Sequence, residues 1–200
     1  MKVLITGFEP FHTVNVNPTQ RLIEDSSSWI PREFALNHIQ ISTFVLPVSY
    51  QSSIKILDEL VANNQPDIII ETGAHRNETK ILLEKRAKNL NHSKIADNCA
   101  EVRIDQVIVA DKAQYLYGNL CLEQLKLRLD SAGVANEISD NAGSFVCNHL
   151  YYWTLANYPE KKIGFLHFPV DLHSTERTNR LHQSACACMQ NLLKFLVESY

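Results

Sequence analysis

Segments with the character of strands alternate with segments of helical character along nearly the whole chain. Apolar or β-branched runs predict strands at residues 2–6, 38–48, 66–73, 134–139 and 162–170. Helical spacing and capping residues predict helices at residues 17–25, 50–64, 121–133, 146–158 and 175–199. This alternation is typical of a parallel sheet with helices on both faces, so we expect a single α/β domain over residues 1–200.

The composition limits the classes of function. The chain has 200 residues, of which 45% are hydrophobic, and its formal net charge is -3. Mixed charges with a small negative sum argue against a protein that binds nucleic acid or a membrane surface. No run of about 18 apolar residues is present to span a bilayer, and the apolar stretch at the start is too short for a signal peptide. We therefore expect a cytoplasmic protein.

The chain has five cysteines, an odd number that argues against a disulfide framework. Either all are reduced core thiols, or one is reactive among reduced bystanders. His182 and Cys186 share a face of the last predicted helix, but Cys188 points about 200° away from Cys186, so these three are not expected to chelate a metal ion. His149, two residues after Cys147, is expected to be structural for the same geometric reason.

Three polar side chains are candidates for chemistry at the carboxyl ends of the strands, where ligands bind in open α/β sheets. Cys147 lies at or near the first turn of the helix after the strand at 134–139, where unpaired N–H groups and the helix dipole favour a thiolate. His167 ends the strand at 162–170 and is placed to act as a general base or to hold the thiolate as an ion pair. Glu84 is a candidate to orient the imidazole. Each residue alone is more often structural: a buried thiol, a satisfied histidine and a solvated glutamate.

Between residues 73 and 111 the periodic signal weakens, and the chain is charged with only short apolar runs. Glu84 lies here, directly after three apolar residues. A long irregular insertion in a compact domain usually serves function. Phe8 and Phe11, in "TGFEPF", fit the core or the apolar wall of a ligand pocket equally well. With one glycine and no lysine, that segment is not a phosphate-binding loop.

Several segments together resemble one known family. "TGFEPF" followed by "NPT" is similar to its N-terminal signature, "AGSFVCNHLYY" to the segment with its nucleophile, and "GFLHFP" to the segment with its histidine. "EKRAKN" and "ADN" match its glutamate motif and the following loop in part. On these motifs the chain resembles pyroglutamyl peptidase type I (pyrrolidone-carboxylate peptidase), a family of cysteine peptidases, over essentially its whole length.

This resemblance implies a three-layer α/β/α sandwich with a mostly parallel, mixed central sheet. It implies hydrolysis of N-terminal pyroglutamate (5-oxoproline) from peptides, with Cys147 as nucleophile, His167 as base and later acid, and Glu84 as the residue that orients the histidine. The residues implied to bind the flat, neutral lactam are Phe8, Phe11, Asn17, Ile95, Phe145 and Val146. Lys94 stands where the family has an arginine near the scissile carbonyl.

The resemblance also implies that no metal or cofactor is needed. The partners would be peptides with a blocked N-terminus. A homo-oligomer, either a dimer or a tetramer, is expected because the family commonly assembles in that way.

The sequence departs from the family between residues 74 and 100. Ala74 and His75 replace part of a glutamine-and-glycine stretch, Ala96 replaces the proline of "PDN", and Ala100 stands where the family has glycine. These differences bear on substrate identity more than on reaction type. Two alternatives stay open: a thiol amidase of related mechanism with another acyl group, and a catalytically silent homologue that binds peptides or lactam-like ligands.

Overall fold

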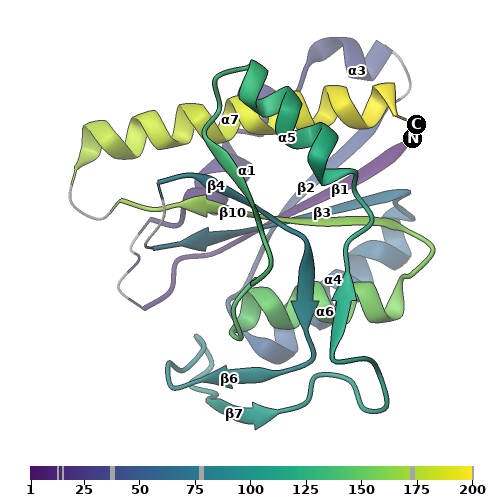
Figure 1. Ribbon diagram of the computed structural model, residues 1–200, viewed down its shortest axis with the longest axis vertical. Coiled ribbons are helices and arrows are strands. Elements are labelled where there is room, and N and C mark those ends of the chain that lie inside the picture. Colours follow the sequence, from purple (N-terminus) through teal and green to yellow (C-terminus); the bar gives the residue numbers. More distant parts are fainter. Residues whose placement is uncertain (13, 15, 37–38, 77–78, 172–173, 200) are drawn as a thin grey trace.

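A six-stranded sheet runs through the middle of the computed structural model, which describes residues 1–12, 14, 16–36, 39–76, 79–171 and 174–199 (Figure 1). In spatial order its strands are β2 (Gln40–Leu46), β1 (Lys2–Phe8), β3 (Ile68–His75), β10 (Lys162–Pro169), β4 (Ile81–Glu84) and β9 (Asn136–Ser139). The first four strands of this order are parallel, β4 runs antiparallel to β10, and β9 runs parallel to β4. The expectation of a mostly parallel, mixed sheet is confirmed.

Helices cover both faces of the sheet, as expected for a three-layer sandwich (Figure 1). One face carries α1 (Pro18–Glu24), α2 (Ser26–Trp29), α3 (Arg32–Leu36), α5 (Leu122–Ser131) and α7 (Thr175–Glu198), and the other carries α4 (Tyr50–Asn64) and α6 (Val146–Asn157). Alternate residues of a strand point to opposite faces, so β1 contributes to two cores. Val3 and Ile5 pack on the side of α1 and α7, whereas Leu4 packs on the side of α4 and α6.

Side-chain caps mark the predicted helix starts. The Asn17 side chain accepts a hydrogen bond from the backbone N–H of Thr19 at 3.0 Å, and a proline occupies the first position of α1. Ser49 caps α4 in a similar way. The start of α6 differs, because its N-cap residue, Phe145, makes no side-chain cap. The first N–H groups of α6 therefore have no partner within the helix or from the N-cap side chain.

Residues 73–111, expected to be irregular, contain several short strands, and this expectation is wrong. β4 lies inside the main sheet, between β10 and β9. Two small sheets follow, one of β5 (Arg86–Lys88) and β8 (Tyr115–Tyr117), the other of β6 (Asn91–Ser93) and β7 (Arg103–Gln106). Strands of three or four residues are too short to show a periodic pattern. We call residues 91–106 the arm; in Figure 1 its strands lie beyond α4 and α6, at the lower end of the molecule.

The side chain of Glu71, on β3, is fully buried against α6. Burial raises the pKa of this carboxyl to about 8, although its hydrogen bond with Thr154 acts in the opposite direction. The Thr154 hydroxyl lies 2.5 Å from Glu71 Oε1 and 2.9 Å from the carbonyl oxygen of Leu150.

Replacing Glu71 with glutamine is expected to stabilise the fold at neutral and alkaline pH. Because the pKa of Glu71 is raised above its ordinary value of 4.5, the folded protein keeps a proton that the unfolded chain releases. The free energy of unfolding therefore falls as pH rises from about 4.5 to about 8, and a glutamine removes this loss. The expected gain in the free energy of unfolding is small at about pH 5 and is about 3 kcal/mol at about pH 7. Urea unfolding at the two pH values measures it.

The matched control is Glu137→Gln, because Glu137 is exposed on β9 in a surface ion pair with Lys80. Because a surface ion pair contributes little, that substitution is expected to change the free energy of unfolding by less than about 1 kcal/mol. A gain from Glu71→Gln that is equal at acid and alkaline pH would contradict the buried, protonated state of Glu71.

Candidate active site

Cys147 is the second residue of α6, at the positive end of that helix, as predicted. Its side chain is partly buried. Cys147 belongs to the first turn of α6, whose backbone N–H groups have no partner within the helix and no side-chain cap. Such N–H groups can stabilise an oxyanion, the negatively charged oxygen that forms when a nucleophile attacks a carbonyl carbon.

Glu84 and His167 meet across two neighbouring antiparallel strands. Glu84 lies opposite Phe165 in the register of β4 and β10, so its side chain emerges on the same face as Phe165 and His167. Glu84 Oε1 lies 2.7 Å from His167 Nδ1, and the two residues are 1% and 4% exposed. The carboxylate thus holds the imidazole by Nδ1 and leaves Nε2 for another partner. Glu84 reaches the site from a strand of the main sheet, not from an irregular loop.

The sulfur of Cys147 and the imidazole of His167 are neighbours, because both approach the same point beside Gly73. Gly73, which is paired with His167 in the register of β3 and β10, makes room for this contact. A Cβ atom on Gly73 would lie 2.8 Å from Cys147 Sγ and 3.0 Å from His167 Cδ2, too close for ordinary van der Waals contact. Gly73 was not among the residues predicted for the site, although a glycine inside a strand often marks a close approach.

The imidazole of His167 is positively charged at neutral pH. Burial alone lowers the pKa of His167, but the hydrogen bonds to Cys147 and Glu84 outweigh burial and raise the pKa to about 9. A cation beside a sulfur favours the thiolate, which is the nucleophilic form. The three side chains therefore have the geometry of a thiolate–imidazolium pair that is oriented by a carboxylate.

A narrow cleft opens beside the sulfur. It is lined by Cys147, by the predicted residues Phe8, Phe11, Asn17, Phe145 and Val146, and by two residues that were not predicted, Val48 and Ala74. Val48 follows the end of β2 and Ala74 lies near the end of β3. The carboxyl ends of parallel strands were therefore the signal that pointed to them. The cleft is mostly apolar, and the rings of Phe11 and Phe145 lie 5.8 Å apart.

The remaining predicted contacts differ in how they relate to this cleft. Asn17 is 1% exposed, and its amide is largely engaged: Nδ2 donates to the carbonyl of Glu9 at 2.9 Å, and Oδ1 accepts from Thr19. An amide nitrogen has two protons, so one N–H of Asn17 is left for a ligand. Lys94 and Ile95 are exposed on the arm, and neither is among the described residues that line the cleft.

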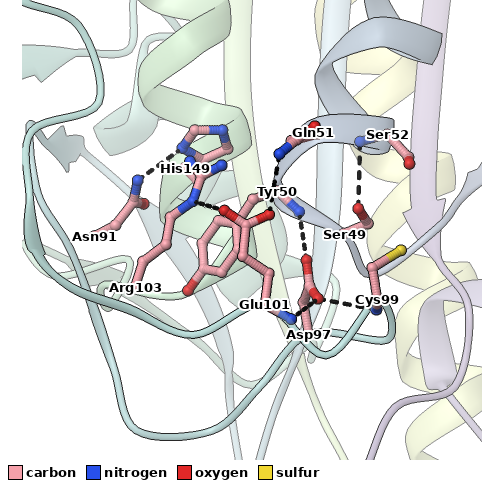
Figure 2. A network of polar contacts seen from close by, with 10 residues as sticks. All are labelled: Ser49, Tyr50, Gln51, Ser52, Asn91, Asp97, Cys99, Glu101, Arg103 and His149. Atoms are coloured by element: carbon pink, nitrogen blue, oxygen red, sulfur yellow. Dashed lines mark hydrogen bonds and ion pairs between the residues drawn. The ribbon is translucent and has the colours of Figure 1, made fainter.

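His149 is buried beside Tyr50 and Asn91 and does not act as the partner of Cys147 (Figure 2). Its Nδ1 atom lies 3.2 Å from Asn91 Nδ2, and its ring stands edge-on to Tyr50 with centroids 5.4 Å apart. Burial, and then the charge of Arg103, lower the pKa of His149 to about 4. The ring is therefore neutral at physiological pH, and the Asn91 amide donates to Nδ1. The prediction of a structural histidine is confirmed.

Another thiol, Cys186, also has a histidine neighbour, but it lies on α7, which covers the opposite face of the sheet from α6. Cys186 Sγ lies 3.6 Å from His182 Nε2, which lies 2.9 Å from Asp25 Oδ2. Burial raises the pKa of Cys186 and lowers the pKa of His182, so both groups favour their neutral forms. This arrangement lacks the charged imidazole that favours a reactive thiolate.

Within the described ranges of the chain, no group of three or more His, Cys, Asp or Glu side chains is placed to hold a metal ion. In the same residues, no helix combines the length and the apolar character needed to cross a membrane.

The sequence and the fold are both similar to those of known proteins. The family model described as Pyroglutamyl peptidase matches residues 1–190. The pyrrolidone-carboxylate peptidase of Alkaliphilus oremlandii is 32% identical over 173 residues, which cover 84% of this chain and 78% of that protein. The protein of the same name from Vibrio vulnificus (strain YJ016) is 32% identical over 171 residues, with the same shares.

Solved structures agree with the sequence matches. The pyrrolidone carboxyl peptidase of Fervidobacterium islandicum AW-1 superposes with a TM-score of 0.84 at 27% identity, covering 97% of this chain and 99% of that one. Pyroglutamyl peptidase I of Bacillus amyloliquefaciens gives a TM-score of 0.80 at 25% identity, covering 95% of each chain.

Proposed function

Since this chain belongs to the pyroglutamyl peptidase family, a family of cysteine peptidases that remove N-terminal pyroglutamate, we propose that it performs this hydrolysis through Cys147, His167 and Glu84. One observation carries the assignment of the residues. A thiol at an uncapped helix start lies beside a buried imidazole, which a buried carboxylate holds at 2.7 Å next to an apolar cleft.

The first half of the reaction transfers the acyl group to sulfur. The Cys147 thiolate attacks the carbonyl carbon that joins the pyroglutamyl residue to the next amine, and the carbonyl oxygen becomes an oxyanion. The N–H groups at the start of α6 stabilise that charge. The carbon–nitrogen bond then breaks, the leaving amine takes the proton of His167 Nε2, and a thioester remains on Cys147.

The second half returns the enzyme to its resting state. The neutral imidazole of His167 takes a proton from water, and the resulting hydroxide attacks the thioester carbon. The carbon–sulfur bond breaks, free pyroglutamate leaves, and the thiolate–imidazolium pair is restored. Glu84 accepts the hydrogen bond from Nδ1 throughout, so it keeps Nε2 directed at the reacting atoms.

The cleft suits a flat, uncharged ring. Aromatic walls from Phe8, Phe11 and Phe145 contact the faces of a lactam without requiring it to carry charge. The remaining N–H of Asn17 is suited to a lactam carbonyl. A proline in the same place would bring a charged ring nitrogen into an apolar lining, which is unfavourable.

Cleavage of a pyroglutamyl arylamide tests this function, with the prolyl arylamide as the matched control. We expect release of the arylamine from the first compound and little or none from the second, because the rings are alike in size but differ in charge. Faster cleavage of an arylamide with another acyl group would favour the thiol amidase. No cleavage, with Cys147 alkylating no faster than a free thiol, would favour the silent homologue.

The activity is expected to fall at alkaline pH with a midpoint near about 9, because His167 must be protonated to hold the thiolate and to protonate the leaving amine. Its pKa is raised above the ordinary 6.5, so its contribution to stability is complete below about 6.5 and is lost as pH rises through about 9. A pH profile of kcat/KM measures the first effect. An activity that stays constant well above that midpoint would count against His167 as the acid.

Two expectations from the sequence stay predictions. A homo-oligomer, dimer or tetramer, is tested by sedimentation of the purified protein. The cytoplasmic location is tested by fractionation of cells that express it.

A further inference from the structure

The arm holds one aromatic residue, Tyr50, at two points (Figure 2). Tyr50 is the first residue of α4, and its backbone N–H donates to Asp97 Oδ2 at 3.0 Å. On the ring, the guanidinium carbon of Arg103 lies 4.4 Å from the centroid, which is the geometry of a cation–π contact. Asp97 and Arg103 both belong to the arm, so the position of Tyr50 depends on it.

The two contacts come from one connected unit. Asp97 Oδ1 accepts hydrogen bonds from the backbone N–H groups of Cys99 at 2.9 Å and Glu101 at 2.8 Å. Glu101 Oε1 in turn lies 2.7 Å from Arg103 Nε. Asp97 is 5% exposed and the Arg103 side chain is 15% exposed, so water screens these charges less than it screens a surface pair.

Tyr50 packs against the wall of the cleft. Its ring meets the ring of Phe145 edge-on, with centroids 5.6 Å apart and an interplanar angle of 84°. Phe145 lines the cleft and precedes Cys147 by two residues. The Tyr50 hydroxyl has no hydrogen-bond partner among the described residues, so the contribution of Tyr50 at this point is its ring.

The start of α6 has an anchor that does not involve Tyr50. The side chain of Asn148 accepts from the backbone N–H of Lys88 at 2.8 Å and donates to its carbonyl at 2.9 Å. Glu84 and His167 lie on strands of the main sheet. A change at Tyr50 is therefore transmitted to the ring of Phe145 more directly than to the reacting groups.

We propose that Arg103 and Tyr50 are positioning residues that set the place of Phe145 and so determine the affinity of the cleft for the lactam ring. The contacts run in one chain from the Glu101–Arg103 pair through Tyr50 to Phe145. Neither Arg103 nor Tyr50 lines the cleft among the described residues. The inference rests on the proposed function, because the pyroglutamyl ring is the ligand whose binding it concerns.

Steady-state kinetics of Arg103→Met with a pyroglutamyl arylamide test the proposal. Methionine keeps much of the aliphatic stem but has no cation for Tyr50, and we expect KM to rise by about fivefold to tenfold with kcat within about twofold. Tyr50→Leu is expected to raise KM in the same way. Tyr50→Phe keeps the aromatic ring and is expected to have the KM of the parent protein. The matched control is Arg86→Met, because Arg86 makes a similar contact with Tyr115, at 4.2 Å, away from the cleft.

Hydrogen exchange gives a readout that does not depend on activity. In Arg103→Met, residues 142–147 are expected to exchange faster while β1 exchanges at the parent rate, which separates a local effect from general destabilisation. An unchanged KM, or a loss of kcat alone, in Arg103→Met would overturn the proposal while leaving the proposed function intact. If the parent protein cleaves no pyroglutamyl substrate, the proposed function fails. The exchange experiment still tests this inference in that case. Unchanged exchange at residues 142–147 in Arg103→Met would overturn it, and faster exchange would support the coupling from Arg103 to Phe145.

Discussion

Cys147→Ser is expected to lower kcat/KM for a pyroglutamyl arylamide by at least about 10³-fold. The imidazolium of His167 is suited to hold a thiolate, but a serine hydroxyl is far less acidic and stays protonated beside the same group. The substitution replaces one small side chain by another at a partly buried position, so the fold is expected to persist. Thermal unfolding of the variant checks that the loss is chemical.

The matched control is Cys186→Ser. Cys186 is also partly buried and also has a histidine neighbour, yet it lies on α7, and burial raises its pKa. We expect this variant to keep the parent activity. Retention of more than about a tenth of the activity in Cys147→Ser would show that another group makes the bond to the substrate.

Gly73→Ala is expected to lower kcat/KM by at least about 10²-fold. The added methyl group would push apart the sulfur of Cys147 and the imidazole of His167, which must be in contact for the reaction. Its carbon would lie 2.8 Å from Cys147 Sγ and 3.0 Å from both His167 Cδ2 and Phe165 Cζ. Since Phe165 packs beside His167, with centroids 4.8 Å apart, the imidazole has little room to move away. The loss is expected mainly in kcat, with a smaller change in KM.

Gly164→Ala separates this effect from a general loss of packing. Gly164 lies on β10, three residues before His167, and a Cβ atom there would collide with the side chain of Leu120 instead of a reacting group. We expect Gly164→Ala to lower the melting temperature and to keep most of its kcat below that temperature. Equal losses of kcat in the two variants would count against a specific role for Gly73.

The parallel strands and long helices could be predicted because each carries its own local signal. The apolar run at the centre of β3 and the Asn17 cap of α1 are examples. β4 could not be found in this way, because its apolar run of three residues is too short to be told from the short apolar runs of a loop. Its charged surroundings made the segment look irregular, although it lies beside β10 in the sheet.

The candidate site was predictable only in part. The motifs around Cys147 and His167 pointed to both residues, and most of the implied lactam contacts do line the cleft. Gly73 escaped because its importance depends on how close two side chains from other elements approach it. The link from Arg103 to Phe145 escaped for a similar reason. It joins the arm, α4 and the start of α6, which are separated in sequence, and no local pattern encodes such contacts.

Labelling of the five cysteines with iodoacetamide, in the presence and absence of free pyroglutamate, tests the central claim most directly. Mass spectrometry of the digested protein gives a rate for each thiol. We expect Cys147 to react first near neutral pH, activity to disappear in step with its modification, and pyroglutamate to slow the labelling of Cys147 alone. If the exposed Cys99 or Cys121 reacts first while Cys147 stays unmodified, or if pyroglutamate does not protect Cys147, the assignment of nucleophile and cleft is wrong.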